Sequence, residues 1–438
     1  MTAGGLSVAV EDALREVGGV WFGWSGKVDG SGSSQVRQVT KRQITYATMP
    51  LIRRDYDNFY KGYSNSTLWP LLHYRPNLVE NRIAFAKSYR RVNQLFARKL
   101  SKIIGRADNV WVHDYHLMLV ARELHGIGLK NRIGFFLHTP FPSPEIFMAC
   151  SDHAELVRGL MHYDLIGFQT KIDVRNFYEY VRHEAGGVVR GRQVEAYGRR
   201  ARARYFPISI YPQPLQRAAA EAAGSYQTRR LVRSLGDKLL IIGVDRLDYS
   251  KGLDNRFGAY EKLLSNYPEN RGRVTYMQIA PPSRTELPHY REIRGKLEGM
   301  AGHINGKFAE FDWVPIRYLN KSFKRELLMG FFRSARVGLV TPLRDGMNLV
   351  AKEYVVAQNP DDPGVLVLSR FAGAAQELKS AIIVNPYDVG AMAEAMQRAL
   401  TMKREERQER WHSMMKTLQR KNLGVWRKNF LSELENQH

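Results

Sequence analysis

The stretch from Leu339 to Gln358 reads LVTPLRDGMNLVAKEYVVAQ and joins a strand-like run to a helix-like run through a short polar turn. Residues 337–340 are all apolar or glycine, as in a buried parallel strand, and Pro342 ends that run. From Met347 onward, apolar residues recur at helical spacing. The turn is therefore predicted to lie at a helix N-terminus, where unpaired backbone N–H groups and the positive end of the helix dipole can bind a phosphate.

Two acidic residues mark this stretch. Asp345 lies in the turn, and Glu353 follows eight residues later. If both were helical, about 12 Å along the axis would separate them, which exceeds the roughly 5–9.5 Å between the paired carboxyl groups of a glycosidase. The spacing fits two ends of a longer, phosphorylated ligand. On this stretch alone, an N-capping aspartate with a surface glutamate is an equally good interpretation.

Length and composition indicate a large globular protein. The chain has 438 residues, enough for two or three domains, with 44% hydrophobic and 25% charged residues. No apolar run approaches the about 18 residues that cross a membrane, and no signal-peptide pattern is visible, so a cytoplasmic location without membrane contact is expected. The single cysteine, Cys150, excludes an intrachain disulfide and is expected to be a packed thiol.

The charge of the chain is unusual. Its 66 Lys and Arg against 43 Asp and Glu give +23, which fits nucleic acid, an anionic membrane surface or acidic small substrates. The densest basic run, VRGRQVEAYGRRARARY at 189–205, contains glycines that favour a solvated loop, with a polyanion contact as the alternative. No zinc-finger spacing or aromatic RNA-binding signature accompanies it, so a nucleic-acid partner is not expected.

Short apolar runs alternate with helical patterns along the whole chain, which indicates parallel sheets covered by helices on both faces. The runs form two groups, separated by a proline-containing stretch at 205–220 that is interpreted as a linker. We therefore predict an α/β protein with two doubly wound, Rossmann-like domains facing a cleft. Their predicted bounds are 1–215 and 216–415, and a C-terminal helix at 416–438 is expected to return to the first domain. The predicted strands are 109–113, 133–138, 164–168, 239–245, 274–280, 336–341, 365–369 and 381–385.

Ligands of such sheets bind beyond the carboxyl ends of the strands. Several polar residues follow predicted strands there: Asp114, His116, His138, Arg246, Lys251, Arg284 and Asp345. Each alone could be structural, for example as a packed histidine or as half of an exposed ion pair between Arg246 and Asp248. Their shared placement favours a binding site, and three cations near a helix N-terminus suit more than one phosphate.

Long motifs throughout the chain resemble those of the trehalose-6-phosphate synthase family, retaining glycosyltransferases with two Rossmann-like domains of the GT-B type. The motifs include WFGWSGK at 21–27, WVHDYHLMLVARELH at 111–125, RIGFFLHTPFPSPEIF at 132–147, GVDRLDYSKGL at 243–253 and TPLRDGMNLVAKEYVVAQNPDDPGVLVLSRFAGAAQEL at 341–378. The resemblance covers essentially the whole chain. It implies transfer of glucose from UDP-glucose to glucose 6-phosphate, giving trehalose 6-phosphate and UDP.

The resemblance also implies roles for individual residues. Asp345 would contact the hydroxyls of the donor glucose, and Glu353 the ribose of UDP. The implied UDP-glucose site comprises Gly4, Gly5, Arg246, Lys251, Phe323, Asp345, Leu349, Val350, Ala351, Lys352 and Glu353. The implied acceptor site comprises Tyr60, Trp69, Asp114 and Arg284, and the implied catalytic residues are Asp345, Arg246, Lys251 and His138, the last near the transferred sugar. Neither a metal nor another cofactor is expected, because Arg246 and Lys251 would balance the phosphate charge. A homodimer or homotetramer is expected.

The chain departs from the family pattern in two places. Members begin with a strand and an SNR-like turn before the Gly-Gly loop, whereas this chain begins at the loop, so the first domain is expected to lack its first strand and to bind acceptor more weakly. Ser209 and Tyr211 stand where a glycine and an acid are usual. Three alternatives therefore stay open: a related transferase that uses glycerol 3-phosphate or a cyclitol, a truncated inactive form, and a polyanion-binding protein.

Overall fold

The computed structural model describes residues 10–11, 14–15, 17–30 and 34–436. Contacts within the chain divide it into a first unit, residues 1–208 with 424–438, and a second unit, residues 209–423. The division predicted from the sequence placed the first boundary at 215 and a returning helix at 416–438. In the structure the first boundary follows Ile208, and the chain rejoins the first unit at Gly424.

The described residues of the first unit form two sheets. The larger has the order β4-β5-β6-β9-β8-β7, with β4, β5, β6 and β9 parallel and the last two strands antiparallel; the smaller has the order β1-β3-β2. Its strands are β1 (Gly19–Asp29), β2 (Arg37–Lys41), β3 (Ile44–Ile52), β4 (Val110–His113), β5 (Ile133–Phe136), β6 (Leu165–Phe168), β7 (Val188–Arg190), β8 (Gln193–Ala196) and β9 (Arg199–Tyr205). Its helices are α2 (Arg53–Asp55), the π-helix η1 (Tyr56–Leu68), α3 (Trp69–Leu72), η2 (Pro76–Leu78), α4 (Ile83–Leu100), η3 (Tyr115–Leu117), α5 (Val120–Gly126), α6 (Pro144–Phe147), α7 (His153–Leu160), α8 (Lys171–His183) and α17 (Leu423–Glu435).

Helix α17 completes the core on the larger sheet of the first unit. Phe430 is fully buried, and its ring stacks on Trp111 of β4 with centroids 4.3 Å apart. Gly134 of β5 and Gly167 of β6 make room for this ring, because a Cβ at either position would lie 2.7 Å from it. The two glycines therefore fix where α17 can pack on the sheet.

The second unit has one parallel sheet in the order β12-β11-β10-β13-β14-β15. Its strands are β10 (Leu239–Val244), β11 (Val274–Ile279), β12 (Ile316–Leu319), β13 (Val337–Val340), β14 (Val365–Ser369) and β15 (Ile382–Val384). Its helices are α9 (Pro212–Ala223), α10 (Tyr226–Leu235), η4 (Tyr249–Lys251), α11 (Leu253–Asn266), η5 (Pro268–Asn270), α12 (Pro288–Phe308), α13 (Arg325–Arg333), α14 (Leu349–Ala357), η6 (Gly373–Gln376), α15 (Val389–Thr401) and α16 (Arg404–Arg420).

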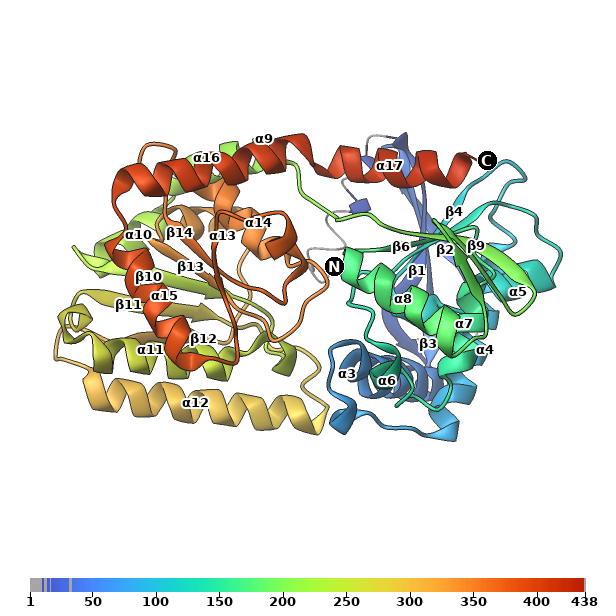
Figure 1. Ribbon diagram of the computed structural model, residues 1–438, viewed down its shortest axis with the longest axis horizontal. Helices are drawn as coiled ribbons and strands as arrows, with labels where there is room; N and C mark the ends of the chain where they lie inside the picture. The colour runs from blue at the N-terminus through green and yellow to red at the C-terminus, as the bar shows by residue number, and fades with distance from the viewer. Residues whose placement is uncertain (1–9, 12–13, 16, 31–33, 437–438) are drawn as a thin grey trace. The chain divides into compact units, whose positions relative to one another are not determined.

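Helices cover both faces of this sheet, as predicted. Strands β11, β13 and β14 are buried at every residue, which requires apolar packing on each side. Helices α11, α12 and α15 share one core with inward-facing residues of the sheet, and Figure 1 shows α9, α13 and α14 on the opposite side from α11 and α12. All eight predicted strands of the chain are present, with ends shifted by two residues or fewer.

Two local predictions were wrong. The basic run at 189–205 is not a solvated loop, because it forms the end of β7, all of β8 and β9 and the turns between them, with Ala201 and Ala203 buried between more exposed arginines. Arg204 pairs with Glu433 of α17 at 2.8 Å. The proline-rich stretch is not wholly irregular either: Pro212 begins α9, where the missing N–H of a first-turn proline costs nothing.

Other predictions concern single residues and the chain ends. Cys150 is buried, as predicted, and burial raises the pKa of its thiol to about 11. No helix in the described part of the chain is long and apolar enough to span a membrane. Gly4 and Gly5 lie outside the described residues, and the expectation about a first strand falls on the same region of the chain.

Replacing Phe430 by alanine should lower the free energy of unfolding by about 3–5 kcal/mol, because it empties a space that the two glycines cannot fill. Urea unfolding followed by circular dichroism measures this change. Phe311→Ala is the control, since Phe311 is fully exposed, and it should change stability by less than about 0.5 kcal/mol. Equal stability of the Phe430→Ala and wild-type proteins would show that α17 does not complete this core.

Candidate active site

The stretch 339–358 folds into the predicted strand, turn and helix. Asn348 is the N-cap of α14, with φ of +73°, and its side-chain oxygen accepts a hydrogen bond from the Ala351 N–H at 3.2 Å. Asparagine tolerates this left-handed backbone better than most residues. The alternative of an N-capping aspartate is therefore wrong. Glu353 is only 8% exposed, so it is not a surface glutamate either.

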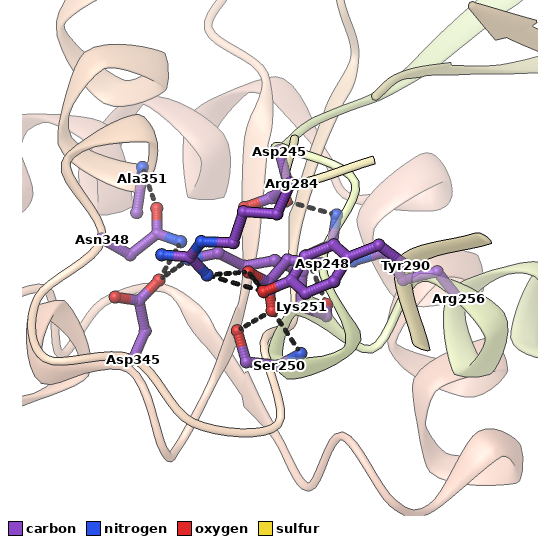
Figure 2. Close-up of polar contacts among 10 residues, drawn as sticks. All are labelled: Asp245, Asp248, Ser250, Lys251, Arg256, Arg284, Tyr290, Asp345, Asn348 and Ala351. Atoms are coloured by element: carbon purple, nitrogen blue, oxygen red, sulfur yellow. Dashed lines mark hydrogen bonds and ion pairs between the residues drawn. The ribbon is translucent and has the colours of Figure 1, made fainter. Parts of the chain in front are cut away.

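Lys251 and Asp345, at the centre of the predicted site, are in contact. The Asp345 carboxylate accepts hydrogen bonds from the Lys251 ammonium and from Asn348 Nδ2, the latter at 3.0 Å (Figure 2). Lys251 follows β10 and Asp345 follows β13, which are neighbouring parallel strands. Gly252 has φ of +61°, and a Cβ there would lie 3.0 Å from the Thr341 carbonyl oxygen, so this turn needs a glycine.

A buried guanidinium underlies this turn. Arg256 of α11 is 0% exposed and donates to Asp245 Oδ2 at 2.7 Å, to Thr341 Oγ1 at 2.9 Å and to the Lys251 carbonyl oxygen at 3.2 Å. Asp245 follows β10 and Thr341 follows β13, so one side chain ties both strand ends to the Lys251 turn. This network was not predicted from the sequence. Its signal is an arginine on the otherwise apolar, buried face of α11.

The Arg284 guanidinium is held by two buried groups. Its Nη1 lies 3.2 Å from Asp248 Oδ2 and 2.6 Å from the Tyr290 hydroxyl, which donates to the same Asp248 oxygen at 3.0 Å (Figure 2). One alternative placed Asp248 in an exposed ion pair with Arg246. Asp248 is 0% exposed, so that alternative is wrong. Burial raises the pKa of Tyr290, and Asp248 raises it further, whereas Arg284 and Arg246 act in the opposite direction. The phenol therefore stays protonated and can donate.

The loop between β10 and α11 connects these two networks. Asp248 Oδ1 accepts hydrogen bonds from the backbone N–H and the hydroxyl of Ser250, at 3.0 and 2.9 Å. Lys251 follows directly and reaches Asp345. Arg246, on the same loop, has an exposed side chain at the end of β10. The structure thus brings together the predicted cations of this loop, Arg284 and the Asp345 carboxylate within the second unit.

Helix α14 carries five of the predicted donor residues, Leu349 to Glu353. Leu349, Val350 and Ala351 form its first turn, as a backbone phosphate contact requires. The Lys352 side chain points away from such a ligand, because it is fully buried and its ammonium lies 2.7 Å from Glu377. Burial lowers the pKa of Lys352, and Glu377 opposes that effect. Only the backbone of Lys352 is therefore available to a ligand at the N-terminus of α14.

At the predicted nucleotide end, Glu353 is paired with an arginine. Its Oε1 accepts from Arg325 Nε at 3.0 Å and from Arg325 Nη2 at 2.7 Å. Phe323 lies two residues before this arginine, and its ring contacts Phe331 edge-on at 5.6 Å. The start of α13 therefore links Phe323 to Glu353, two residues that the family resemblance assigned to the same nucleotide. Arg325 was not among the predicted residues.

Three predicted acceptor residues lie in or against one turn of the first unit. Asp114, with φ of +71°, directly precedes Tyr115 and His116. Tyr60 of the π-helix η1 stacks on His116 with centroids 6.0 Å apart, and the ring of Trp69 lies 5.9 Å from that of Tyr115. Inserted π-helical turns occur often at functional sites. Arg284, the fourth predicted acceptor residue, belongs to the second unit.

An aromatic neighbour of this turn was not predicted from the sequence either. Trp24 of β1 packs against Tyr60 with ring centroids 4.7 Å apart. Its motif, WFGWSGK, carried the family resemblance, but nothing in the residues alone indicated which of its aromatic side chains would reach Tyr60.

His138 is held by a chain of hydrogen bonds in the first unit. Gln169 Oε1 accepts from the Ile208 N–H at 3.0 Å, which turns its amide nitrogen toward His138 Nδ1 at 3.4 Å. The proton of the neutral His138 ring is thereby assigned to Nε2, which lies 3.0 Å from His113 Nδ1. Burial lowers the pKa of His113 to about 3 and that of His138 well below its ordinary value. Both ring nitrogens of His138 are engaged, which suits a fixed contact surface better than a proton donor.

Within the described residues, no cluster of three or more His, Cys, Asp or Glu side chains could hold a metal ion. Cations, a partly buried carboxylate and a capped helix N-terminus lie instead at the carboxyl ends of a parallel sheet. Together with a second Rossmann-like unit, this arrangement is typical of glycosyltransferases that use nucleotide sugars.

Comparison with known proteins agrees with this class. The sequence pattern of glycosyltransferase family 20 matches residues 1–436, and the chain belongs to that family. A trehalose-6-phosphate synthase from Sinorhizobium fredii (strain NBRC 101917 / NGR234) is 47% identical over 435 residues, 99% of this chain and 94% of the relative. One from Enterobacter sp. (strain 638) is 48% identical, over 99% of this chain and 91% of the relative.

Two solved structures are similar to this chain in both sequence and fold. An alpha,alpha-trehalose-phosphate synthase (UDP-forming) from Burkholderia xenovorans, in complex with glucose-6-phosphate, has a TM-score of 0.98 and 50% identity, covering 99% of this chain and 97% of that one. An E. coli protein bound with UDP-2-fluoro glucose has a TM-score of 0.96 and 46% identity, covering 100% of this chain and 97% of that one. The predicted GT-B architecture and the family resemblance are both confirmed.

Replacing Arg256 by methionine should lower the free energy of unfolding by about 3–5 kcal/mol, because it leaves the buried Asp245 carboxylate without its partner. Urea unfolding measures the loss, and adding Asp245→Asn should restore part of it. Arg294→Met, at an exposed pair with Glu298, is the control and should cost about 1 kcal/mol or less. An Arg256→Met protein no less stable than this control would contradict the role of the network.

Acidification should destabilise the first unit through its neutral histidines. An unfolded histidine has a pKa near 6.5, so between about pH 3 and that value the unfolded chain binds a proton that folded His113 does not. The free energy of unfolding should therefore fall as pH drops from 7 to 5, with about 2 kcal/mol of the fall due to His113. Urea unfolding at both pH values should show a smaller fall for His113→Asn.

The matched control for this pH effect is His183→Asn, an exposed histidine at the end of α8 in the same unit. It should retain the fall that the wild type shows. An identical pH dependence in the His113→Asn and His183→Asn proteins would rule out His113 as its source.

Proposed function

We propose that this chain transfers glucose from UDP-glucose to glucose 6-phosphate with retention of configuration, giving trehalose 6-phosphate and UDP. The observation that carries the proposal is the contact of Lys251 with Asp345 beside the N-cap residue of α14. Relatives at 47–50% identity over almost the whole chain bear the name of that activity. One solved relative holds glucose-6-phosphate and another UDP-2-fluoro glucose.

The donor half of the reaction follows from charge. When the bond between glucose C1 and the phosphate oxygen breaks, UDP leaves with the electron pair and negative charge grows on its β-phosphate. Lys251, Arg246 and the N–H groups at the start of α14 would stabilise that charge where it develops. Asp345 would then hold the donor glucose through its hydroxyls while it orients the Lys251 ammonium.

The acceptor half needs no protein nucleophile. The anomeric hydroxyl oxygen of glucose 6-phosphate would attack C1 on the face that UDP leaves, and its proton would pass to the departing phosphate oxygen. Tyr60, Trp69 and Asp114 would contact the acceptor sugar. Arg284, fixed by Asp248 and Tyr290, supplies a planar guanidinium suited to a phosphate.

We also propose that the protein needs no cofactor and that it forms a homo-oligomer in the cytoplasm. Arg246 and Lys251 provide the positive charge that a metal would otherwise supply, so no metal or other cofactor is needed. We propose a homo-oligomer, a dimer or a tetramer, that works in the cytoplasm without a nucleic-acid partner. Arg204 and Arg202 of the basic run already face Glu433, at 2.8 and 3.7 Å, which leaves less of that charge for a polyanion.

The test is an assay of the purified protein with UDP-glucose and a panel of acceptors: glucose 6-phosphate, glycerol 3-phosphate and a phosphorylated cyclitol. Mass spectrometry should find trehalose 6-phosphate with the first acceptor and little product with the others. Lys251→Ala should lower kcat by about 10²–10³-fold, because it removes charge stabilisation of the leaving diphosphate. Size-exclusion chromatography with light scattering gives the oligomeric state.

Lys262→Ala, on the solvent side of α11, is the control for Lys251 and should keep the wild-type rate. Preferred transfer to glycerol 3-phosphate or a cyclitol would replace the proposed acceptor by that of a related transferase. Absence of UDP release with every acceptor would indicate an inactive member of the family. A near-normal rate for Lys251→Ala would reject the role of that lysine.

A further inference from the structure

We infer that Arg325 is a positioning residue for nucleotide recognition. It holds one carboxylate oxygen of Glu353 so that the other oxygen is presented to the ribose hydroxyls of the uridine nucleotide. The inference rests on the proposed function, which assigns the ribose to Glu353. Beyond that function, we infer that Arg325 orients the Glu353 carboxylate and balances its charge beside the diphosphate.

The contact between the two side chains is asymmetric. Both Arg325 donors, Nε at 3.0 Å and Nη2 at 2.7 Å, converge on the same Glu353 oxygen, Oε1. Among the described residues, none donates a hydrogen bond to Oε2, and this atom is not among those sealed from solvent without a partner. A carboxylate oxygen is an acceptor only, so Oε2 suits a hydroxyl donor such as ribose.

Both partners are held by their helices. Arg325 is the first residue of α13, and Glu353 lies in the middle of α14, with side chains 28% and 11% exposed. At its other end α13 is fastened to the same helix, because Arg333 donates to the Ala357 and Gln358 carbonyl oxygens at 3.3 and 3.1 Å. The Glu353 carboxylate therefore has little freedom to rotate, and less of its side-chain entropy is lost when a ligand binds.

The Arg325–Glu353 pair also reduces repulsion between the Glu353 carboxylate and the diphosphate. Glu353 follows Leu349, the first residue of α14, by four positions, which is about 6 Å along a helix. An uncompensated carboxylate so near the expected diphosphate would repel it in a partly buried setting. The Arg325 guanidinium balances that charge. Its planar fork fixes orientation as well, which a lysine ammonium, a point charge on a flexible stem, cannot do.

A purely structural role for Arg325 predicts different results. If the arginine only joined α13 to α14, its loss would lower stability and weaken every uridine nucleotide by the same factor. A positioning role predicts that the loss depends on the ribose hydroxyl that Glu353 reads. Comparison of ligands with and without that hydroxyl therefore separates the two roles.

The experiment is isothermal titration calorimetry with UDP, 2′-deoxy-UDP and 3′-deoxy-UDP. The wild type should bind UDP about 10- to 100-fold more tightly than the analogue that lacks the hydroxyl read by Glu353, as for a hydrogen bond to a charged group. Arg325→Gln should reduce that ratio to about threefold or less. Arg325→Lys should bind both ligands more tightly than Arg325→Gln, because it keeps the charge, but should not recover the ratio.

Arg333→Gln is the matched control, since it removes an arginine that joins the same two helices without touching Glu353. It should lower Tm and keep the wild-type ratio. If Arg325→Gln binds UDP and keeps the full ratio, Arg325 does not position Glu353 and the inference is overturned alone. If the wild-type protein does not bind UDP at all, the proposed function fails, and the inference fails with it.

Discussion

The geometry of the second unit depends on one buried guanidinium. Arg256 bonds to Asp245 beyond β10, to Thr341 beyond β13 and to the backbone of Lys251, all without exposure to solvent. A charge in such a place is tolerated only when it is paired and its donors are satisfied. Because a looser arrangement would leave these groups unpaired, the ends of β10 and β13 and the Lys251 turn are held in fixed positions. Lys251 is the cation that contacts Asp345.

Several parts of the candidate site add local constraints to this frame. Asn348 and Arg284 both adopt left-handed backbone conformations, with φ of +73° and +49°. Such conformations are unfavourable for residues with a Cβ and persist where the surroundings over-determine them. Here Asn348 caps α14 and bonds to Asp345, and Arg284 is clamped by Asp248 and Tyr290. Arg284 is a predicted acceptor residue and Asn348 contacts Asp345, although Arg42, Tyr74 and Tyr197, which were assigned to no substrate, also have positive φ.

The sequence was most informative where chemistry and periodicity coincide. Apolar runs located eight strands of the two larger sheets but missed the parallel strands β9 and β12, and the strand-end rule placed Lys251 and Asp345 at the same edge of one sheet. Pairings across long separations could not be predicted. Glu353 and Arg325 are 28 residues apart and meet only because α13 packs on α14, and Arg204 finds Glu433 229 positions later. Periodicity could have revealed β9, whose alanines and arginines alternate, but its charge made a loop the simpler interpretation.

The place of α17 in the sequence has a consequence for biosynthesis. Residues 423–435 follow the whole of the second unit, yet the Phe430 ring occupies the space that Gly134 and Gly167 leave on β5 and β6. On the ribosome, the second unit emerges as one continuous segment and can fold as soon as it is complete. The first unit must wait with an apolar sheet face uncovered for more than 200 further residues, and at about 5–20 residues per second that delay lasts at least 10 seconds. Until α17 is made, this exposed apolar surface makes the nascent first unit prone to aggregation.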